Sequence, residues 1–232
     1  MKKYIGTKQV KAEPMTKGEA FNAKLLRAES ILEDEIDEPG YKVVYPDGYE
    51  SWSPAKVFEA AYVKADTALD RMAIEYTELS SKRDRLETVL NGEKYDGFDK
   101  PIKAMLHVQH RSMVEYLAVL AARSTRMQTG EGGLSDMSFS QVIPLLENGF
   151  AVRRSGWNGK DIVVFKQVPA EIGEETIPKM QSLPNEAKEL IMSSSKHIDY
   201  TSQCLIFNSK TGRADSWVPS ISDVFAKDWE LV

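Results

Sequence analysis

The chain has 232 residues, 42% of them hydrophobic and 28% charged, and a formal net charge of −5. This acidic balance argues against wrapping long nucleic acid, which needs a basic surface that displaces counterions, but it allows a small nucleotide in a local basic pocket. The one cysteine, Cys204, excludes an internal disulfide framework and a cysteine-based zinc site. Neither a signal peptide nor a stretch of membrane-spanning apolar length is found, so we expect a cytosolic protein.

Residues 1–64 are predicted to form a small N-terminal module. It begins with a short strand at 3–11 and a helix at 16–32, in which Thr16 is the N-cap and a glutamate three residues later completes a capping box. The acidic segment 33–39 follows. Its spacing imposes no ligand geometry, which favours a solvated loop over a metal site.

A β-hairpin and a second helix complete this module. Segments 41–45 and 49–52 are rich in strand-forming residues and flank a Pro-Asp-Gly turn. Ser53 and Pro54 then open a helix at 55–63 as N-cap and first helical residue. We expect the aromatic residues of the hairpin to pack it onto this helix rather than to form a second stacking surface; they are Tyr45, Tyr49 and Trp52.

Residues 65–127 are predicted to form an antiparallel helical hairpin, because apolar residues recur at alternating spacings of three and four. Asn91-Gly92 ends the first helix, and Phe98 or Asp99 begins the second, with Pro101 in its first turn. Such a stripe is long for an isolated pair of helices. It therefore predicts a homo-oligomer.

A glycine-rich linker, 128–136, precedes a C-terminal domain at 137–232. Ser138 or Ser140 caps its first helix, which an Asn-Gly pair closes. With Ser140 as the cap, Pro144 falls within the first turn; with Ser138, the proline lies inside the helix and should kink it.

The rest of this domain is predicted to be mainly β-structure. Strands at 151–154 and 162–168 are joined by a two-residue turn at Asn158-Gly159. An insertion at 169–196 carries a helix, 185–192. The last predicted elements are strands at 200–208 and 213–217 and a helix or turn at 220–226. The expected fold class is α+β: a small N-terminal module with a β-hairpin, a helical hairpin, and a C-terminal antiparallel sheet with a packed helix.

Aromatic and charged residues at the two ends of the C-terminal domain suit one pocket for a planar anion. Trp157 and Trp217 could sandwich or edge a base, and Arg154 could fork onto a phosphate. Arg153 and Arg154 face opposite sides of a strand, so only one can reach such a pocket. Each residue has an alternative role: a core position for Trp217, solvent for Arg154, the turn for Asn158, a helix cap for Asp223, and a hydrophobic staple for Phe139.

The blocks 139–149, 152–160, 215–220 and 226–230, with Asp223, resemble the second Thoeris anti-defence family of phage proteins. This resemblance implies a sponge that binds a cyclic ADP-ribose-type signal in the cytoplasm of the infected bacterial host and does not degrade it. It also implies a small homo-oligomer, typically a tetramer, with pockets at subunit interfaces. The ligand-binding residues expected from the motif and the resemblance together are Phe139, Arg154, Trp157, Asn158, Trp217, Ser220 and Asp223.

Residues 81–126 resemble the helical hairpin of phage anti-CBASS and first-type Thoeris anti-defence sponges, some of which bind cyclic dinucleotides. The resemblance adds cyclic di- or oligonucleotides as a second ligand class. Lys100 and Lys103, near the start of a helix where backbone N–H groups favour anions, are the candidate phosphate contacts, with ordinary solvated lysines as the alternative.

No enzyme is expected, because the sequence has no nucleophile elbow, no phosphate-cradling glycine loop and no metal constellation. Serines at 193–195 with His197 lack an acid placed to orient the histidine. We therefore predict no catalytic residue, no cofactor and no metal. The alternative to the sponge is a phage structural or interaction protein that oligomerises through its helical hairpin.

Overall fold

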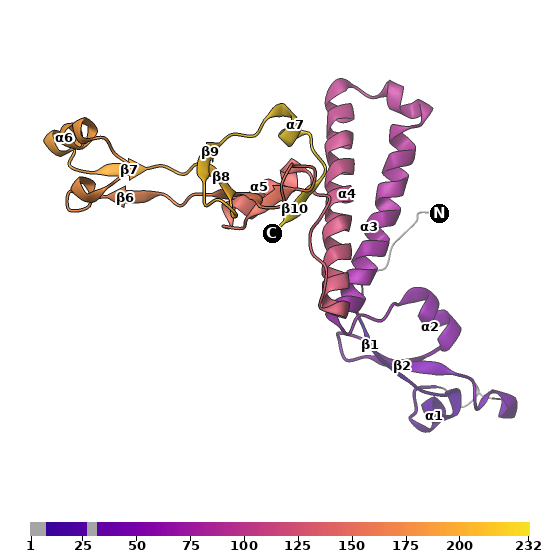
Figure 1. Ribbon diagram of the computed structural model, residues 1–232. Helices are drawn as coiled ribbons and strands as arrows, with labels where there is room; N and C mark the ends of the chain where they lie inside the picture. Colours follow the sequence, from indigo (N-terminus) through magenta and orange to yellow (C-terminus); the bar gives the residue numbers. More distant parts are fainter. Residues whose placement is uncertain (1–7, 27–31) are drawn as a thin grey trace. The chain divides into compact units, whose positions relative to one another are not determined.

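The computed structural model describes residues 8–26 and 32–232 (Figure 1). Helices and antiparallel sheets combine in these residues, so the predicted α+β class is confirmed. The chain divides into two compact units, Met1–Ile74 and Glu75–Val232. The four-part division drawn from the sequence stays a prediction. Throughout the described part of the chain, every helix is too short or too polar to cross a membrane.

A three-stranded antiparallel sheet forms the frame of the first unit. Its strands, in spatial order, are β1 (Lys11–Pro14), β2 (Gly40–Val44) and β3 (Glu50–Pro54). The predicted hairpin is confirmed as β2–β3; the Tyr45 N–H donates to the Tyr49 carbonyl at 2.9 Å, and Gly48 has φ +84°. Of the strand predicted at 3–11, residues 8–10 are not in a strand and β1 begins at Lys11, while residues 3–7 lie outside the described part.

Helix α1 (Lys17–Asn22) has the predicted capping box. The Thr16 N–H donates to the Glu19 carboxylate at 2.8 Å, and the Glu19 N–H returns a bond to the Thr16 hydroxyl. The predicted extension of this helix to residue 32 is wrong, because Lys24 adopts φ +62°, a left-handed conformation that ends helices. Residues 27–31 lie outside the described part.

Aromatic side chains pack α2 (Ala55–Ala61) onto the sheet of the first unit. The rings of Tyr41 and Phe58 stack with centroids 4.4 Å apart. The Trp52 Nε1–H donates to the Met15 carbonyl, just before α1, at 2.8 Å; its predicted packing onto the helix at 55–63 stays a prediction. Tyr49, at the turn, is 65% exposed.

The helical hairpin is confirmed as α3 (Ala68–Leu90) and α4 (Lys100–Thr129), joined by the short 3-10 helix η3 (Glu93–Gly97). The Asp99 carboxylate accepts the Ile102 N–H at 2.9 Å and so caps α4. Buried leucines contributed by the two helices are Leu86, Leu117 and Leu120.

A five-stranded antiparallel sheet in the order β10-β4-β5-β8-β9 carries the C-terminal fold. Its strands are β4 (Val152–Arg154), β5 (Ile162–Lys166), β8 (Cys204–Asn208), β9 (Ala214–Trp217) and β10 (Trp229–Leu231). Helix α5 (Phe139–Glu147) contacts β4 and β5. Met137, Val142, Leu146, Val152, Val164 and Trp229 form the buried core.

Ser138 caps α5, and its N–H donates to the Gln141 side chain at 3.1 Å. Pro144 therefore lies inside the helix, the second of the two arrangements expected from the sequence.

The connection between β4 and β5 spans the residues that the predicted strand bounds left between the two strands, but its turn differs from the prediction. Residues 155–161 replace the expected two-residue turn at Asn158-Gly159. The reason is that the Ser155 N–H donates to the Asp228 carbonyl at 2.9 Å, so the loop pairs with the C-terminal segment instead of closing directly on β5. This loop carries Trp157.

The insertion forms a β-ribbon of β6 (Ala170–Ile172) and β7 (Ile198–Tyr200), with the 3-10 helix η4 (Ile177–Lys179) and α6 (Asn185–Ser193) between the strands. Helix α6 confirms the predicted helix. The predicted single strand at 200–208 is instead β7 and β8, because β7 pairs with β6 and β8 pairs with β5.

Candidate functional site

Four aromatic residues from separate elements form one cluster in the C-terminal domain. Trp229 is fully buried, and the Trp157 ring lies 5.3 Å from it between centroids. Trp217 lies 6.1 Å from Trp229, and Phe139 lies 5.7 Å from it. Phe139, Trp157 and Trp217 are only partly buried, so their outer faces remain accessible. The structure therefore brings three of the predicted site residues together around a core tryptophan.

The orientation of the rings decides what this cluster can hold. Trp157 and Trp217 have centroids 6.4 Å apart and planes at 71°. A base clamped between two rings requires nearly parallel planes, so this arrangement does not form a sandwich. The two side chains can instead lie along the edge of a base.

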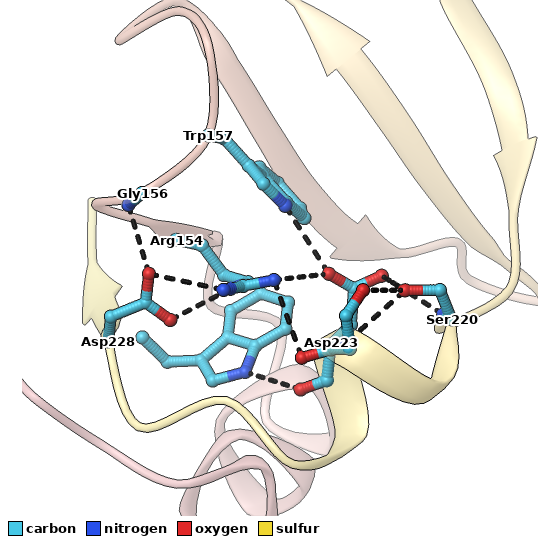
Figure 2. Close-up of polar contacts among 8 residues, drawn as sticks. Arg154, Gly156, Trp157, Ser220, Asp223 and Asp228 are labelled. Carbon is cyan, nitrogen blue, oxygen red and sulfur yellow. Dashed lines mark hydrogen bonds and ion pairs between the residues drawn. The ribbon is translucent and has the colours of Figure 1, made fainter.

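Arg154 is held by two carboxylates (Figure 2). Its Nη1 donates to Asp223 at 2.9 Å, and its Nε donates to Asp228 at 2.8 Å. Nη1 also donates to the backbone carbonyl of Ser222 at 3.4 Å. Hydrogen bonds from the guanidinium to Asp228 and then to Asp223 raise the pKa of Arg154, against the opposing effect of burial. The arginine is therefore a permanent cation that ties strand β4 to the C-terminal segment.

Asp223, on α7 (Ile221–Val224), is buried and bonded through both oxygens. One oxygen accepts from Arg154 and from the Trp157 Nε1–H, the latter at 3.3 Å. The other accepts from the N–H and hydroxyl of Ser220, at 3.0 and 2.7 Å. Burial raises the pKa of Asp223, but the bonds from Ser220, Arg154 and Trp157 outweigh it and hold the pKa below its usual value. Ser220 and Asp223 thus form the capping box of α7, the structural alternative weighed for Asp223.

Asp228 was not among the predicted site residues, although it completes the cluster. Its carboxylate binds Arg154 and accepts the Gly156 N–H at 3.0 Å. These contacts hold its pKa below the usual range, with the Arg154 hydrogen bond as the main cause. A Cβ on Gly156 would lie 2.6 Å from the Asp228 carboxylate, so the loop requires glycine here. The Asp-Trp pair at 228–229 in the sequence was the available signal.

The charges of this group sum to about −1, from one arginine and two ionised carboxylates. Four of the five guanidinium N–H groups already have partners, so a phosphate could fork onto Arg154 with two bonds only by replacing one of these partners. Asn158, predicted beside the same pocket, is exposed in the loop.

An open hollow of about 490 Å³ adjoins the aromatic cluster, a size within the usual range for small-molecule sites. The residues lining it include Arg111 of α4, Phe139 and Ile143 of α5, and Phe225 and Lys227 after α7. Phe139 belongs to both the hollow and the aromatic cluster. The hollow therefore offers aromatic surface next to basic side chains.

Glu115 lowers the positive charge beside this hollow. Its carboxylate accepts from Arg111 Nε at 2.6 Å and from the hydroxyls of Ser138 and Ser140 at 2.6 and 2.7 Å. Burial raises the pKa of Glu115, but these three bonds outweigh it and keep the pKa below its usual value. Arg111 is consequently neutralised, and Lys227 is the exposed cation on the rim.

The second predicted phosphate site, Lys100 and Lys103, lies at the start of α4. Lys103 Nζ donates to the Asp96 carbonyl at 3.2 Å and lies 5.0 Å from the centre of the Tyr95 ring. Lys100 is exposed at the first position of α4. Asp99 already caps this helix end, so an incoming anion would meet a carboxylate there.

Two regions of the chain match known families. Residues 137–232 match the Tad2-like family, described as the Thoeris anti-defense 2-like domain, and residues 66–126 match the Sequestin family. The C-terminal region is also similar to "Thoeris anti-defense 2" of Bacillus phage SP01, at 28% identity over 98 residues, which cover 41% of this chain and 94% of that protein. The resemblance of the C-terminal region is thereby confirmed. The matches support a phage anti-defence role and a binding protein rather than an enzyme.

Proposed function

We propose that this protein is a phage anti-defence sponge that binds a cyclic ADP-ribose-type signal of the Thoeris system, without cleaving it, in the cytoplasm of the infected host. The observation that carries the proposal is the accessible aromatic cluster within residues 137–232, the region similar to the Thoeris anti-defence domain. Sequestration acts by mass action. It therefore requires a low Kd and as many sites as there are signal molecules.

In this proposal the base of the ligand lies against the accessible faces of Trp157 and Trp217, which the ring geometry supports. We assign Arg154 to positioning Asp223, because two carboxylates already bind its guanidinium. A direct contact of Arg154 with phosphate remains the alternative predicted from the sequence. Lys227, on the rim of the adjoining hollow, is a cation that a phosphate can reach without displacing a carboxylate.

We expect the purified protein, incubated with the product of a Thoeris TIR enzyme and freed of unbound nucleotide, to release an intact cyclic ADP-ribose-type nucleotide on heating. Mass spectrometry identifies the released compound and its amount per chain. Trp157→Ala should weaken retention about 5- to 150-fold, because stacking on a base is worth roughly 1–3 kcal/mol. Tyr49→Ala, at an exposed turn of the first unit, is the matched aromatic control and should retain the nucleotide fully.

Three other results of the retention assay would reject all or part of the proposal. An absence of retained nucleotide from the wild-type protein rejects the sponge and leaves a structural or interaction protein as the better account. Release of a processed nucleotide rejects binding without cleavage. Equal retention by wild type and Trp157→Ala places the ligand elsewhere on the chain.

We propose cyclic di- or oligonucleotides as a second ligand class for the helical hairpin, because residues 81–126 resemble the hairpin of phage anti-CBASS sponges; residues 66–126 match the Sequestin family. Lys100 and Lys103 are the proposed phosphate contacts. The same retention assay with a cyclic dinucleotide, repeated on Lys100→Ala, tests this part of the proposal separately from the Trp157 site.

We further propose that the protein is a homo-oligomer, with a tetramer as the expected state. Helix α4 exposes apolar side chains three residues apart, with Met105 61% and Val108 67% accessible in the single chain. Contact with another copy would remove these side chains from water, which is favourable in free energy.

Light scattering after size exclusion should therefore give four chain masses for the wild type and a smaller mass for the double variant Met105→Glu/Val108→Glu. The double variant Val57→Glu/Val63→Glu, at positions of the first unit that are 60% and 73% exposed, serves as the charge-matched control and should leave the mass unchanged. A monomeric wild-type protein at the concentration of the binding assay contradicts the proposal.

A further inference from the structure

We propose that Glu171, His197 and Asp199 bind a divalent transition-metal ion of the zinc class and that this ion fastens the β6–β7 ribbon. The possible ligand atoms of the three side chains all lie within 4.8 Å of one another. A single ion with bonds of about 2.0–2.2 Å to nitrogen and oxygen holds its ligand atoms within about 4.4 Å of one another, so small rotations of these exposed side chains would bring all three onto one ion. Neither the predicted nucleotide site nor the matched helical hairpin includes these residues.

The register of the ribbon explains why these side chains converge. Glu171 on β6 pairs directly with Asp199 on β7, so their side chains point to the same face of the ribbon. His197 lies just before β7, and its ring nitrogens lie within 4.8 Å of the carboxylate oxygens of Glu171 and Asp199. The cluster is consequently built by strand pairing between segments more than twenty residues apart, and no short motif in the sequence announces it.

The hydrogen bonding of His197 suits a metal ligand. Its Nδ1 lies 2.8 Å from the Ser195 carbonyl, which can only accept, so Nδ1–H donates there and Nε2 is the nitrogen left to bind a metal. Nε2 lies 3.7 Å from the Asp199 carboxylate. A ligating histidine that donates its other N–H to a backbone carbonyl is the usual outer-shell arrangement of metal sites.

The backbone before β7 holds this arrangement in place. The Ser195 hydroxyl donates to the His197 carbonyl at 2.7 Å. Lys196, between them, has φ +59°, a left-handed conformation that is unfavourable for a residue with a Cβ. The turn that places the imidazole beside the two carboxylates therefore carries a cost in conformational free energy at Lys196.

Electrostatics supports a cation between the paired acids. Like charges directly opposite each other on neighbouring strands are destabilising, and Glu171 and Asp199 are such a pair. One imidazole and two carboxylates form a mixed nitrogen and oxygen set that suits zinc and its neighbours; calcium and magnesium prefer oxygen alone. All three side chains are exposed, so water can complete the coordination.

A metal ion that joins β6 to β7 would suit the small size of the insertion. The β6–β7 pairing spans only three residue pairs. In the segment that connects these two strands along the chain, the apolar side chain that is fully buried is Ile177 of η4. Short elements with a small core commonly depend on a metal or a disulfide for their stability.

The test uses full-length, tag-free protein, stripped with a chelator and titrated with zinc chloride in a calorimeter. We expect one ion per chain for the wild type, and an affinity at least tenfold weaker for His197→Ala. Trypsin cleavage within the insertion, which contains Lys179 and Lys188, should slow with zinc in the wild type but not in this variant. Glu171→Gln keeps the shape of the side chain and should also weaken binding, which guards against misfolding of His197→Ala.

His107→Ala, which removes an exposed histidine of α4, is the matched control and should bind zinc as the wild type does. Wild-type binding no tighter than that of His197→Ala overturns the proposal. Wild-type affinity in Glu171→Gln, with His197→Ala weakened, also overturns the three-ligand site. Nucleotide retention is measured separately, so failure of the metal site leaves the sponge proposal intact.

Discussion

Trp229→Ala is expected to lower the free energy of unfolding of the C-terminal domain by about 3–5 kcal/mol. The indole is 0% exposed and packs against Phe139, Trp157 and Trp217. Its Nε1–H also donates to the Asp223 carbonyl at 3.0 Å. The substitution thus opens a large cavity and leaves a buried carbonyl without this partner.

Urea unfolding followed by tryptophan fluorescence measures this loss, because three of the four tryptophans lie in the C-terminal domain. Phe225→Ala is the matched control: Phe225 is 78% exposed, so its removal should change stability by less than about 0.5 kcal/mol. Equal effects of the two substitutions would show that Trp229 does not lie in the core.

Arg154→Ala is expected to destabilise the same domain by on the order of 3 kcal/mol. The loss arises because Asp223, with a side chain only 10% exposed, and Asp228 would keep their charges without the cation between them. Arg153→Ala is the control on the opposite face of the same strand. Arg153 pairs with Glu230, both side chains are more than a quarter exposed, and we expect a loss of at most about 1 kcal/mol.

The Arg154→Ala effect should also depend on pH in a defined direction. In the wild type the pKa of Asp223 and that of Asp228 are held below the unfolded value of about 3.9. The stabilisation linked to these lowered values is present above that pH and is lost as the pH falls through the folded-state values. In the variant, protonation relieves the uncompensated carboxylates.

The difference in unfolding free energy between wild type and Arg154→Ala should therefore be largest near neutral pH and shrink below about pH 4. Urea titrations at pH 7 and pH 3 measure it. A difference that is constant across this range would mean that the arginine acts through packing of its alkyl chain and not through its charge.

Local sequence was sufficient where the interactions are local. The stripes at spacings of three and four predicted α3 and α4, because one helix face repeats within a few residues. Thr16 with Glu19, Asp99, and the Pro-Asp-Gly turn also gave correct ends and turns, since each makes its bonds within three or four residues. The same reasoning failed at Asn158-Gly159, where a bond to Asp228 outweighed the local preference for a tight turn.

The sequence by itself thus determined the α+β class, the helical hairpin and a grouping of Phe139, Trp157 and Trp217 in one domain. Only the tertiary structure decided how those side chains are used. Arg154 meets carboxylates some seventy residues away through the pairing of β4 with β10, and Glu171 meets Asp199 through the pairing of β6 with β7. Such contacts depend on strand register across long loops, and no short window of sequence contains that information.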